Sequence, residues 1–170
     1  TLTTLIACGQ DKVLTTDSDT VFWARYYKTI KADIGVEPTE KIQADFYFRF
    51  WNGDKVIELK QVDNNLIGTS TFLIRQYRKN KQREEGRLYF KKYELTNQTT
   101  KMIFELVTKY KIIELPTDKQ IVGWNQGLDG ETYIIEHADK NTYTFKNYWT
   151  PSYHQDKLKE ARQLVDFLSG

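Results

Sequence analysis

Residues 46–62 read FYFRFWNGDKVIELKQV, and this stretch decides the fold. Along its first half, side chains of two kinds alternate, as they do on the two faces of a β-strand. One face is apolar and the other is mixed: Phe46, Phe48 and Phe50 against Tyr47, Arg49 and Trp51. Asn52-Gly53 is a favoured dipeptide for a two-residue hairpin turn, so residues 55–62 are predicted to return as an antiparallel strand.

The chain on the carboxyl side of this hairpin continues the same pattern. Turn residues Asp63-Asn64-Asn65 precede a predicted strand over 66–77, and the charged connection 78–86 leads to another strand over 87–95. Four successive antiparallel strands form a β-meander. A further hairpin is predicted from strands 131–137 and 142–149, whose buried face we expect to hold Tyr133, Ile135, Tyr143 and Phe145.

Three segments have apolar residues at helical spacing. The first lies between Ser18 and Gly35, the second starts at Thr96 or Asn97 and ends before Pro116, and the third covers about 155–168. Their apolar stripes are Phe22, Trp23, Tyr26, Tyr27 and Ile30; Met102, Ile103, Leu106, Val107 and Tyr110; and Leu158, Ala161, Leu164, Val165 and Leu168. We therefore predict an α+β fold, an antiparallel β-meander sheet with two or three helices packed on one face.

Composition narrows the functional classes. A chain of 170 residues fits a single domain, and its 14% aromatic content can fill a sizeable core. The formal net charge of +2 argues against a dedicated nucleic-acid-binding protein. The single cysteine, Cys8, excludes an internal disulfide framework and a multi-cysteine metal site, and no cofactor is expected.

The residues before this cysteine resemble a targeting signal. Residues 1–7 are uncharged and apolar, like the end of a signal peptide, and Leu5-Ile6-Ala7-Cys8 resembles the lipobox of bacterial lipoproteins. In that class the signal is cut before the cysteine, whose thiol carries a diacylglycerol, and the new amino group is usually acylated. Two or three acyl chains anchor a protein stably in a membrane.

This resemblance implies a division of the chain. Residues 1–7 are a signal-peptide remnant, residues 8–19 a lipidated tether, and residues 20–170 a single α+β domain. We expect the protein in the bacterial cell envelope, held to the membrane by lipid on Cys8. Gly9 follows the cysteine where Asp can mark inner-membrane retention, so in a Gram-negative host the outer membrane is favoured. Residues 129–133 through 148–151 also resemble carboxy-terminal parts of uncharacterised bacterial envelope proteins, a likeness that implies no activity.

The glycine-rich segment 122–130 is the first candidate binding site. Trp124, Asn125, Gln126 and Asp129 offer stacking and hydrogen bonds within it. Alternatively, the segment is a structural turn in which Trp124 covers the core. An aromatic platform around Tyr148 is a second candidate, although core packing explains most of its members better.

Basic residues form a third candidate site, with Arg78, Lys81 and Arg83 at its centre. They could contact anionic lipid headgroups or an acidic partner protein. Alternatively, they belong to a solvated hairpin whose charges keep a strand edge from aggregating.

Catalytic patterns are weak. His137 and His154 are the only histidines, and they are not in a metal-binding motif, so we assign no catalytic or metal-ligating residue. We expect a non-catalytic envelope protein that binds a protein, peptide or glycan. The alternatives are an envelope inhibitor or immunity-type protein, and a hydrolase or metal-dependent enzyme in which His137 and His154 converge.

Overall fold

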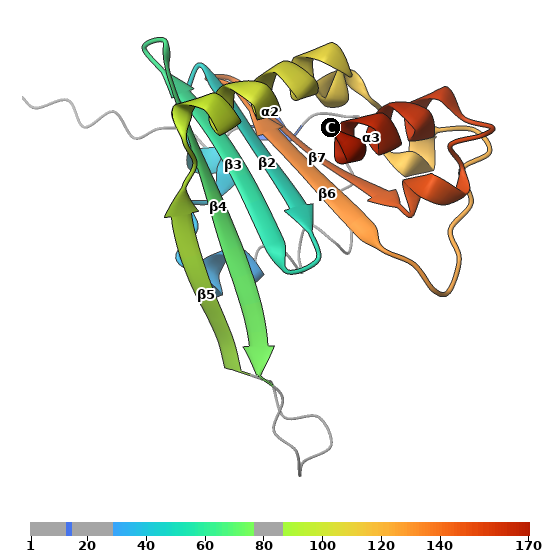
Figure 1. Cartoon of the computed structure of the whole chain (residues 1–170), viewed down its shortest axis with the longest axis horizontal. Coiled ribbons are helices and arrows are strands. Elements are labelled where there is room, and N and C mark those ends of the chain that lie inside the picture. The colour runs from blue at the N-terminus through green and yellow to red at the C-terminus, as the bar shows by residue number, and fades with distance from the viewer. Residues whose placement is uncertain (1–12, 15–28, 77–86) are drawn as a thin grey trace, which may run out of the picture.

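The computed structural model describes residues 13–14, 29–76 and 87–170 (Figure 1). These residues form a seven-stranded sheet in the order β1-β7-β6-β2-β3-β4-β5. All neighbouring strands are antiparallel except β1 and β7, which run parallel. Helices pack against this sheet, so the predicted α+β fold is confirmed.

The strands are β1 (Val13–Leu14), β2 (Phe46–Asn52), β3 (Lys55–Val62), β4 (Asn65–Gln76), β5 (Arg87–Glu94), β6 (Thr132–Ala138) and β7 (Thr142–Trp149). The meander runs from β2 to β5 as predicted. Its second turn is one residue shorter than predicted, because Asn65 already pairs with Val62. The two turn residues, Asp63 and Asn64, have positive φ angles of 49° and 64°, a conformation that Asn and Asp tolerate better than most side chains.

The β6–β7 hairpin joins the sheet beside its earliest long strand. β6 pairs with β2, placing Glu136 opposite Arg49 and Ile134 opposite Trp51. β1 extends the sheet on the far side of β7, with Leu14 opposite Tyr143. Two residues of the stretch interpreted as a tether therefore belong to the sheet, and the rest of residues 8–19 lie outside the described part.

Within the described residues, the two long helices are α2 (Asn97–Lys109) and α3 (Lys159–Ser169). Thr96 caps α2, its Oγ1 accepting a hydrogen bond from the Thr99 amide at 3.1 Å. α3 begins later than predicted, because the preceding residues form the short 3-10 helix η4 (Pro151–Tyr153) and a turn in which the Leu158 amide donates to the His154 carbonyl. The remaining 3-10 helices are η1 (Thr39–Lys41), η2 (Ile112–Glu114) and η3 (Asp118–Gln120).

Both faces of the central sheet are buried. α2 and α3 cover one face (Figure 1), where Phe48 and Phe50 pack with Val107, Leu164 and Phe167. On the opposite face, the chain over residues 29–45 packs against the sheet. It starts with the helical residues 29–33, which lie in the segment predicted as the first helix, whose earlier part is outside the described residues.

The side chains of the β6–β7 hairpin are divided between these faces. Tyr133 and Ile135 contact the helix-covered core, whereas Tyr143 and Phe145 belong to the core under residues 29–45. The expectation that these four share one buried face is therefore wrong. Register explains the division, because Phe145 lies opposite Glu136, and neighbours along a strand point to opposite faces.

Candidate functional site

A buried ionic network lies between the sheet and residues 29–45. Its centre is Glu136, whose side chain is fully buried. Glu136 Oε2 accepts hydrogen bonds at 2.8 Å from Lys31 Nζ, Thr39 Oγ1 and Tyr143 OH, and Oε1 accepts from Trp51 Nε1 at 2.9 Å and Arg49 Nη1 at 3.3 Å. Arg49, also fully buried, links Glu136 to Glu58 through a 3.0 Å ion pair.

The network holds its carboxylates ionised. Burial alone would raise the pKa of Glu136, but Arg49 and Lys31 outweigh burial and set it at about 2. The same opposition operates at Glu58, where burial is outweighed chiefly by Arg49 and by the hydrogen bond from Tyr47, so its pKa is lowered. A general acid at neutral pH needs a raised pKa. The arrangement instead fixes residues 29–45 on the sheet through charge-assisted hydrogen bonds.

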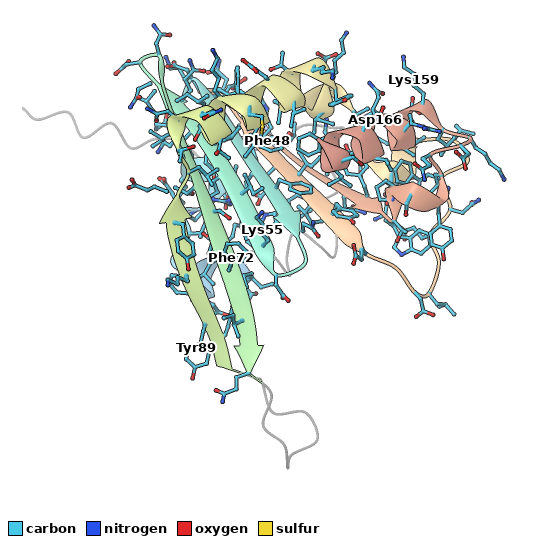
Figure 2. All side chains as sticks on the ribbon, in the orientation of Figure 1. Phe48, Lys55, Phe72, Tyr89, Lys159 and Asp166 are labelled. Atoms are coloured by element: carbon cyan, nitrogen blue, oxygen red, sulfur yellow. The ribbon has the colours of Figure 1, made fainter. Side chains whose placement is uncertain are left out.

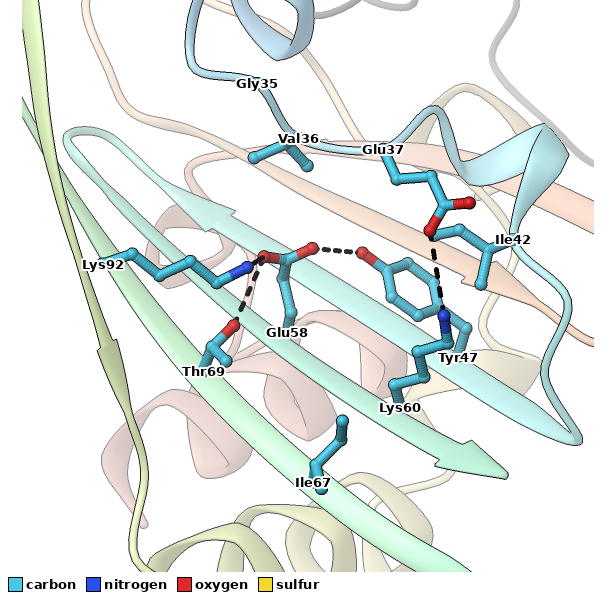
Figure 3. Close-up of a pocket in the computed structure, with 10 residues that line it drawn as sticks. All are labelled: Gly35, Val36, Glu37, Ile42, Tyr47, Glu58, Lys60, Ile67, Thr69 and Lys92. Atoms are coloured by element: carbon cyan, nitrogen blue, oxygen red, sulfur yellow. Dashed lines mark hydrogen bonds and ion pairs between the residues drawn. The ribbon is translucent and has the colours of Figure 1, made fainter. Parts of the chain in front are cut away.

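A pocket of about 270 Å³ lies beside this network, between residues 35–42 and strands β2 to β5 (Figure 3). Its buried acid, Glu58, already accepts from Tyr47 and from Thr69 and Lys92, both at 3.3 Å (Figure 3). Lys60 approaches Glu37 at 3.8 Å across the rim. Because these charged groups are paired with one another, a ligand in the pocket would compete with the existing ion pairs and hydrogen bonds.

The glycine-rich segment is built into the fold. Trp124 is buried, and its Nε1 donates a 2.9 Å hydrogen bond to the Trp149 carbonyl. A Cβ atom at Gly130 would lie 2.2 Å from Thr150 Oγ1, and one at Gly127 would lie 2.6 Å from Trp149 Cη2. The glycines therefore permit close packing on β7, which supports the structural alternative for this segment.

The polar candidates of this segment lie at the surface. Asn125, Gln126 and Asp129 are exposed. Gln126 Nε2 nevertheless donates to Asp118 Oδ2 at 3.3 Å, and the Asn125 carbonyl lies 3.0 Å from His154 Nε2. Two of the three candidates thus also hold the loop in place.

Tyr148 lies in the core, as the alternative of core packing expects, and not on an exposed aromatic platform. Tyr148 is completely buried, and its hydroxyl donates to the Leu115 carbonyl at 3.2 Å. Because its side chain is buried, Tyr148 cannot present its ring to a partner. Trp149 and Tyr153 stack on each other with centroids 5.6 Å apart, so each covers one ring face of the other.

The two histidines lie at opposite ends of the β6–β7 hairpin. His137 pairs with Thr144, while the His154 ring lies 6.2 Å from that of Trp149, at the other end of β7. At about 3.3 Å per residue, Thr144 and Trp149 are roughly 17 Å apart. This separation is too large for both imidazoles to ligate one metal ion, so the geometry does not support the enzyme that requires their convergence. Within the described residues, His, Cys, Asp and Glu form no group of three or more that could hold a metal.

The remaining candidates, Cys8, Arg78, Lys81 and Arg83, lie outside the described residues. Strands β4 and β5, which flank these three basic residues in the sequence, carry a feature that the sequence analysis did not predict. Four large apolar side chains are exposed on the face that α2 crosses: Phe72 (44%), Ile74 (62%), Tyr89 (45%) and Tyr93 (45%). Figure 2 shows Phe72 and Tyr89 on this face, away from the helix.

We name these four residues the hairpin patch. Phe72 and Tyr93 make an edge-to-face contact with centroids 6.0 Å apart, and Lys55 Nζ lies 5.6 Å from the Phe72 ring. Lys55 also lines a groove of about 330 Å³ between the sheet and the helices, with Ile57 and Met102. The patch and the groove are therefore adjacent. Contiguous exposed apolar surface of this kind marks interaction sites.

The β4–β5 hairpin extends past the first residue of β3. β3 begins at Lys55, opposite Phe72, so residues 74–76 pair only with 87–89. β5 is the last strand of the sheet, and among the described residues none pairs with its outer edge. Sequence offered one signal of this surface: apolar residues occur consecutively in Leu88-Tyr89-Phe90, so both faces of β5 carry apolar side chains.

Two further findings concern membrane-spanning helices and similarity to known proteins. None of the helices over residues 29–76 and 87–170 has the length and apolar character needed to cross a membrane. No protein-family model, curated protein or solved structure matches the chain, so the site is interpreted from its own geometry.

Proposed function

We propose that the protein is a non-catalytic, lipid-anchored component of the bacterial cell envelope that binds a partner protein through the β4–β5 hairpin. The observation that carries the proposal is the hairpin patch, which places four large apolar side chains in solvent at an edge of the sheet. By contrast, the large apolar side chains of β2 and β6 lie in or against the two cores.

Two features favour a protein over a glycan as the partner. The patch adjoins an apolar groove and borders the outer edge of β5, with which no described residue pairs; both features suit a polypeptide. The lipobox resemblance of Leu5-Ile6-Ala7-Cys8 supports an anchor that would bring this surface to partners in the envelope.

Site-specific photocrosslinking tests the binding surface. A photoreactive phenylalanine analogue is introduced at Phe72 or Tyr89 in cells that express the protein with a complete signal peptide. The matched controls are Val122 and Leu128, which are also exposed and apolar but lie in the glycine-rich segment. We expect the same protein adduct from Phe72 and Tyr89 and none from the controls. Adducts from the controls alone, or from no position, would contradict the proposal.

Fatty-acid labelling tests the anchor separately. The protein should incorporate labelled palmitate and sediment with membranes, because a thiol at a lipobox receives the diacylglycerol. Cys8→Ser should abolish both. Equal labelling of parent and variant would contradict the assignment of Cys8, without bearing on the hairpin.

A further inference from the structure

We propose that the outer edge of β5 takes up an extended acidic segment of the partner as an additional strand of the sheet. This inference rests on the proposed function and specifies how the hairpin recognises its partner. The segment it predicts has two adjacent acidic residues flanked by apolar ones. Three observations carry it: the direction of the β5 backbone groups, the arrangement of its side chains, and its charge.

The backbone direction follows from the hydrogen bonds of the hairpin. The Leu95 amide donates to the Gly68 carbonyl at 2.9 Å, so Leu95 and Gly68 form a hydrogen-bonded pair. Backbone groups of an antiparallel strand alternate in direction, so Tyr93, Lys91 and Tyr89 also face β4. The residues between them point their amides and carbonyls outward: Leu88, Phe90, Lys92 and Glu94. A new strand could pair with these groups.

The side chains of β5 determine which residues an added strand would place beside them. Tyr89, Lys91 and Tyr93 are on the face of the hairpin patch, whereas Phe90 and Lys92 are on the opposite face. On each face an exposed aromatic ring adjoins a lysine. Since Lys91 and Lys92 are consecutive, an added strand meets them with two consecutive residues, one on each face. Neighbouring apolar residues of that strand would cover Tyr89, Phe90 and Tyr93.

The positive charges of Lys91 and Lys92 favour an acidic partner. Lys91 has no acidic partner among the described residues, and its Nζ lies over the Tyr93 ring at 5.1 Å. Lys92 pairs with Glu58 at 3.3 Å but is half exposed. An opposite charge on a neighbouring strand stabilises pairing, and a like charge opposes it.

The same lysines disfavour a second copy of this chain as the occupant. Two β5 strands placed edge to edge would bring Lys91 and Lys92 of both copies close together. Lysines on an edge strand are a known device against such self-pairing. Charge complementarity therefore favours a different, acidic chain.

Peptide binding to the unlipidated 170-residue chain tests the proposal. The probe is a soluble ten-residue peptide of alternating threonine and valine with adjacent aspartate and glutamate at its centre, and its counterpart carries two lysines instead. Binding is measured by titration, and amide exchange of β5 is followed by NMR. We expect the acidic peptide to bind and to slow exchange at Leu88, Phe90 and Lys92 by about tenfold, and we expect no effect from the lysine peptide.

Matched variants separate backbone from side chain. Phe90→Ala removes the ring but keeps the outward amide, whereas Phe90→Pro removes both, and an outward-facing edge position tolerates proline. The alanine variant should retain binding that the proline variant loses, with slow exchange at Lys91 and Tyr93 showing that the hairpin is intact. Lys91→Glu replaces attraction by repulsion, which should weaken the acidic peptide roughly tenfold and reverse the preference between peptides.

Several results would overturn the inference. Equal binding of both peptides by Phe90→Ala and Phe90→Pro would show that the edge is not used. Protection of the outward amides in the free protein that rises with concentration would assign the edge to a second copy. Photocrosslinks from Phe72 without peptide-induced protection would leave the proposed function intact and reject strand addition. Absence of both crosslinks and binding would reject the two together.

Discussion

The two edges of the sheet differ in how their backbone groups are satisfied. At the β7 edge, the Trp149 amide donates to Asp118 Oδ2 at 2.9 Å, the Asn147 amide contacts Thr117 Oγ1 at 3.4 Å, and β1 pairs at Tyr143. At the β5 edge, the corresponding groups point outward, and no described residue pairs with them. The first edge is closed by the protein itself, whereas nothing in the described part of the chain closes the second, where we propose that another chain binds.

The side chains repeat this contrast. The β6–β7 half buries charged groups such as Glu136 and Asp118 among specific donors. The β4–β5 half exposes apolar rings such as Phe72 and Tyr89. Burying charge and exposing apolar surface both oppose stability unless they are compensated. In the β6–β7 half, hydrogen-bond donors of the protein itself compensate the buried charges. In the β4–β5 half, we propose that a partner covers the exposed apolar rings.

The largest effect is expected from Glu136→Gln. This change leaves the buried charges of Arg49 and Lys31 without their shared counter-ion, which should reduce the free energy of unfolding by about 3–5 kcal/mol. The matched control is Glu94→Gln on exposed β5, which should change stability by less than about 0.5 kcal/mol. Urea unfolding of both variants measures the difference, and similar losses would remove the contrast between the two halves.

Acid should destabilise the protein through the same group. Glu136 has a pKa of about 2 in the folded state against an ordinary value of 4.5. A lowered folded-state pKa gives stability that is complete above pH 4.5 and is lost as the pH falls toward 2, here about 3 kcal/mol. The lowered pKa of Glu58 acts in the same direction. Urea midpoints at pH 7, 4 and 3 should fall more steeply for the parent than for Glu136→Gln, and parallel curves would contradict this role of Glu136.

A smaller loss is expected at the closed edge. Asp118→Ala removes the acceptor of the Trp149 amide and of the side chains of Asn147 and Gln126. Leaving buried donors unpaired should reduce stability by about 1–3 kcal/mol. Asp118→Asn keeps one carbonyl acceptor and should lose less. An alanine variant as stable as the parent would show that this edge does not depend on Asp118.

The smallest stability effect is expected in the hairpin patch. Phe72→Ser and Ile74→Ser each alter an exposed side chain, so each should shift stability by no more than about 0.5 kcal/mol. The double variant should nevertheless lose the adduct formed from Tyr89. A large loss of stability in thermal or urea unfolding would mean that the patch belongs to the core and not to a binding surface.

Local patterns predicted most elements of this fold. Alternation over Phe46–Trp51 and the turn residues at Asn52-Gly53 identified the first hairpin, because both signals arise from neighbours in the chain. Thr96 was correctly expected at the start of α2 for the same reason. The late start of α3 was missed, since its apolar spacing continues back to Leu158 although the chain turns at His154.

Long-range placement limited the prediction of the site. Arg49 was expected on a mixed face, but its burial depends on Glu136, which lies 87 residues away in the sequence. Tyr148 was a binding candidate as a member of an aromatic cluster, and its burial depends on how the β6–β7 hairpin joins β2. The exposure of Phe72 and Tyr89 depends on where β3 begins and where α2 lies. The consecutive apolar residues Leu88-Tyr89-Phe90 indicate only that both faces of β5 carry apolar side chains, and not which of them remain exposed.

Residue-resolved amide exchange of the free protein tests the central claim most directly, because it reads both edges in one experiment. The account predicts rapid exchange at Phe90 and Lys92, slow exchange at Lys91 and Tyr93, and slow exchange at Trp149 on the closed edge. Uniform protection along β5 at all protein concentrations would show that its outer edge is already paired within the chain, and would contradict the claim that it is open to a partner.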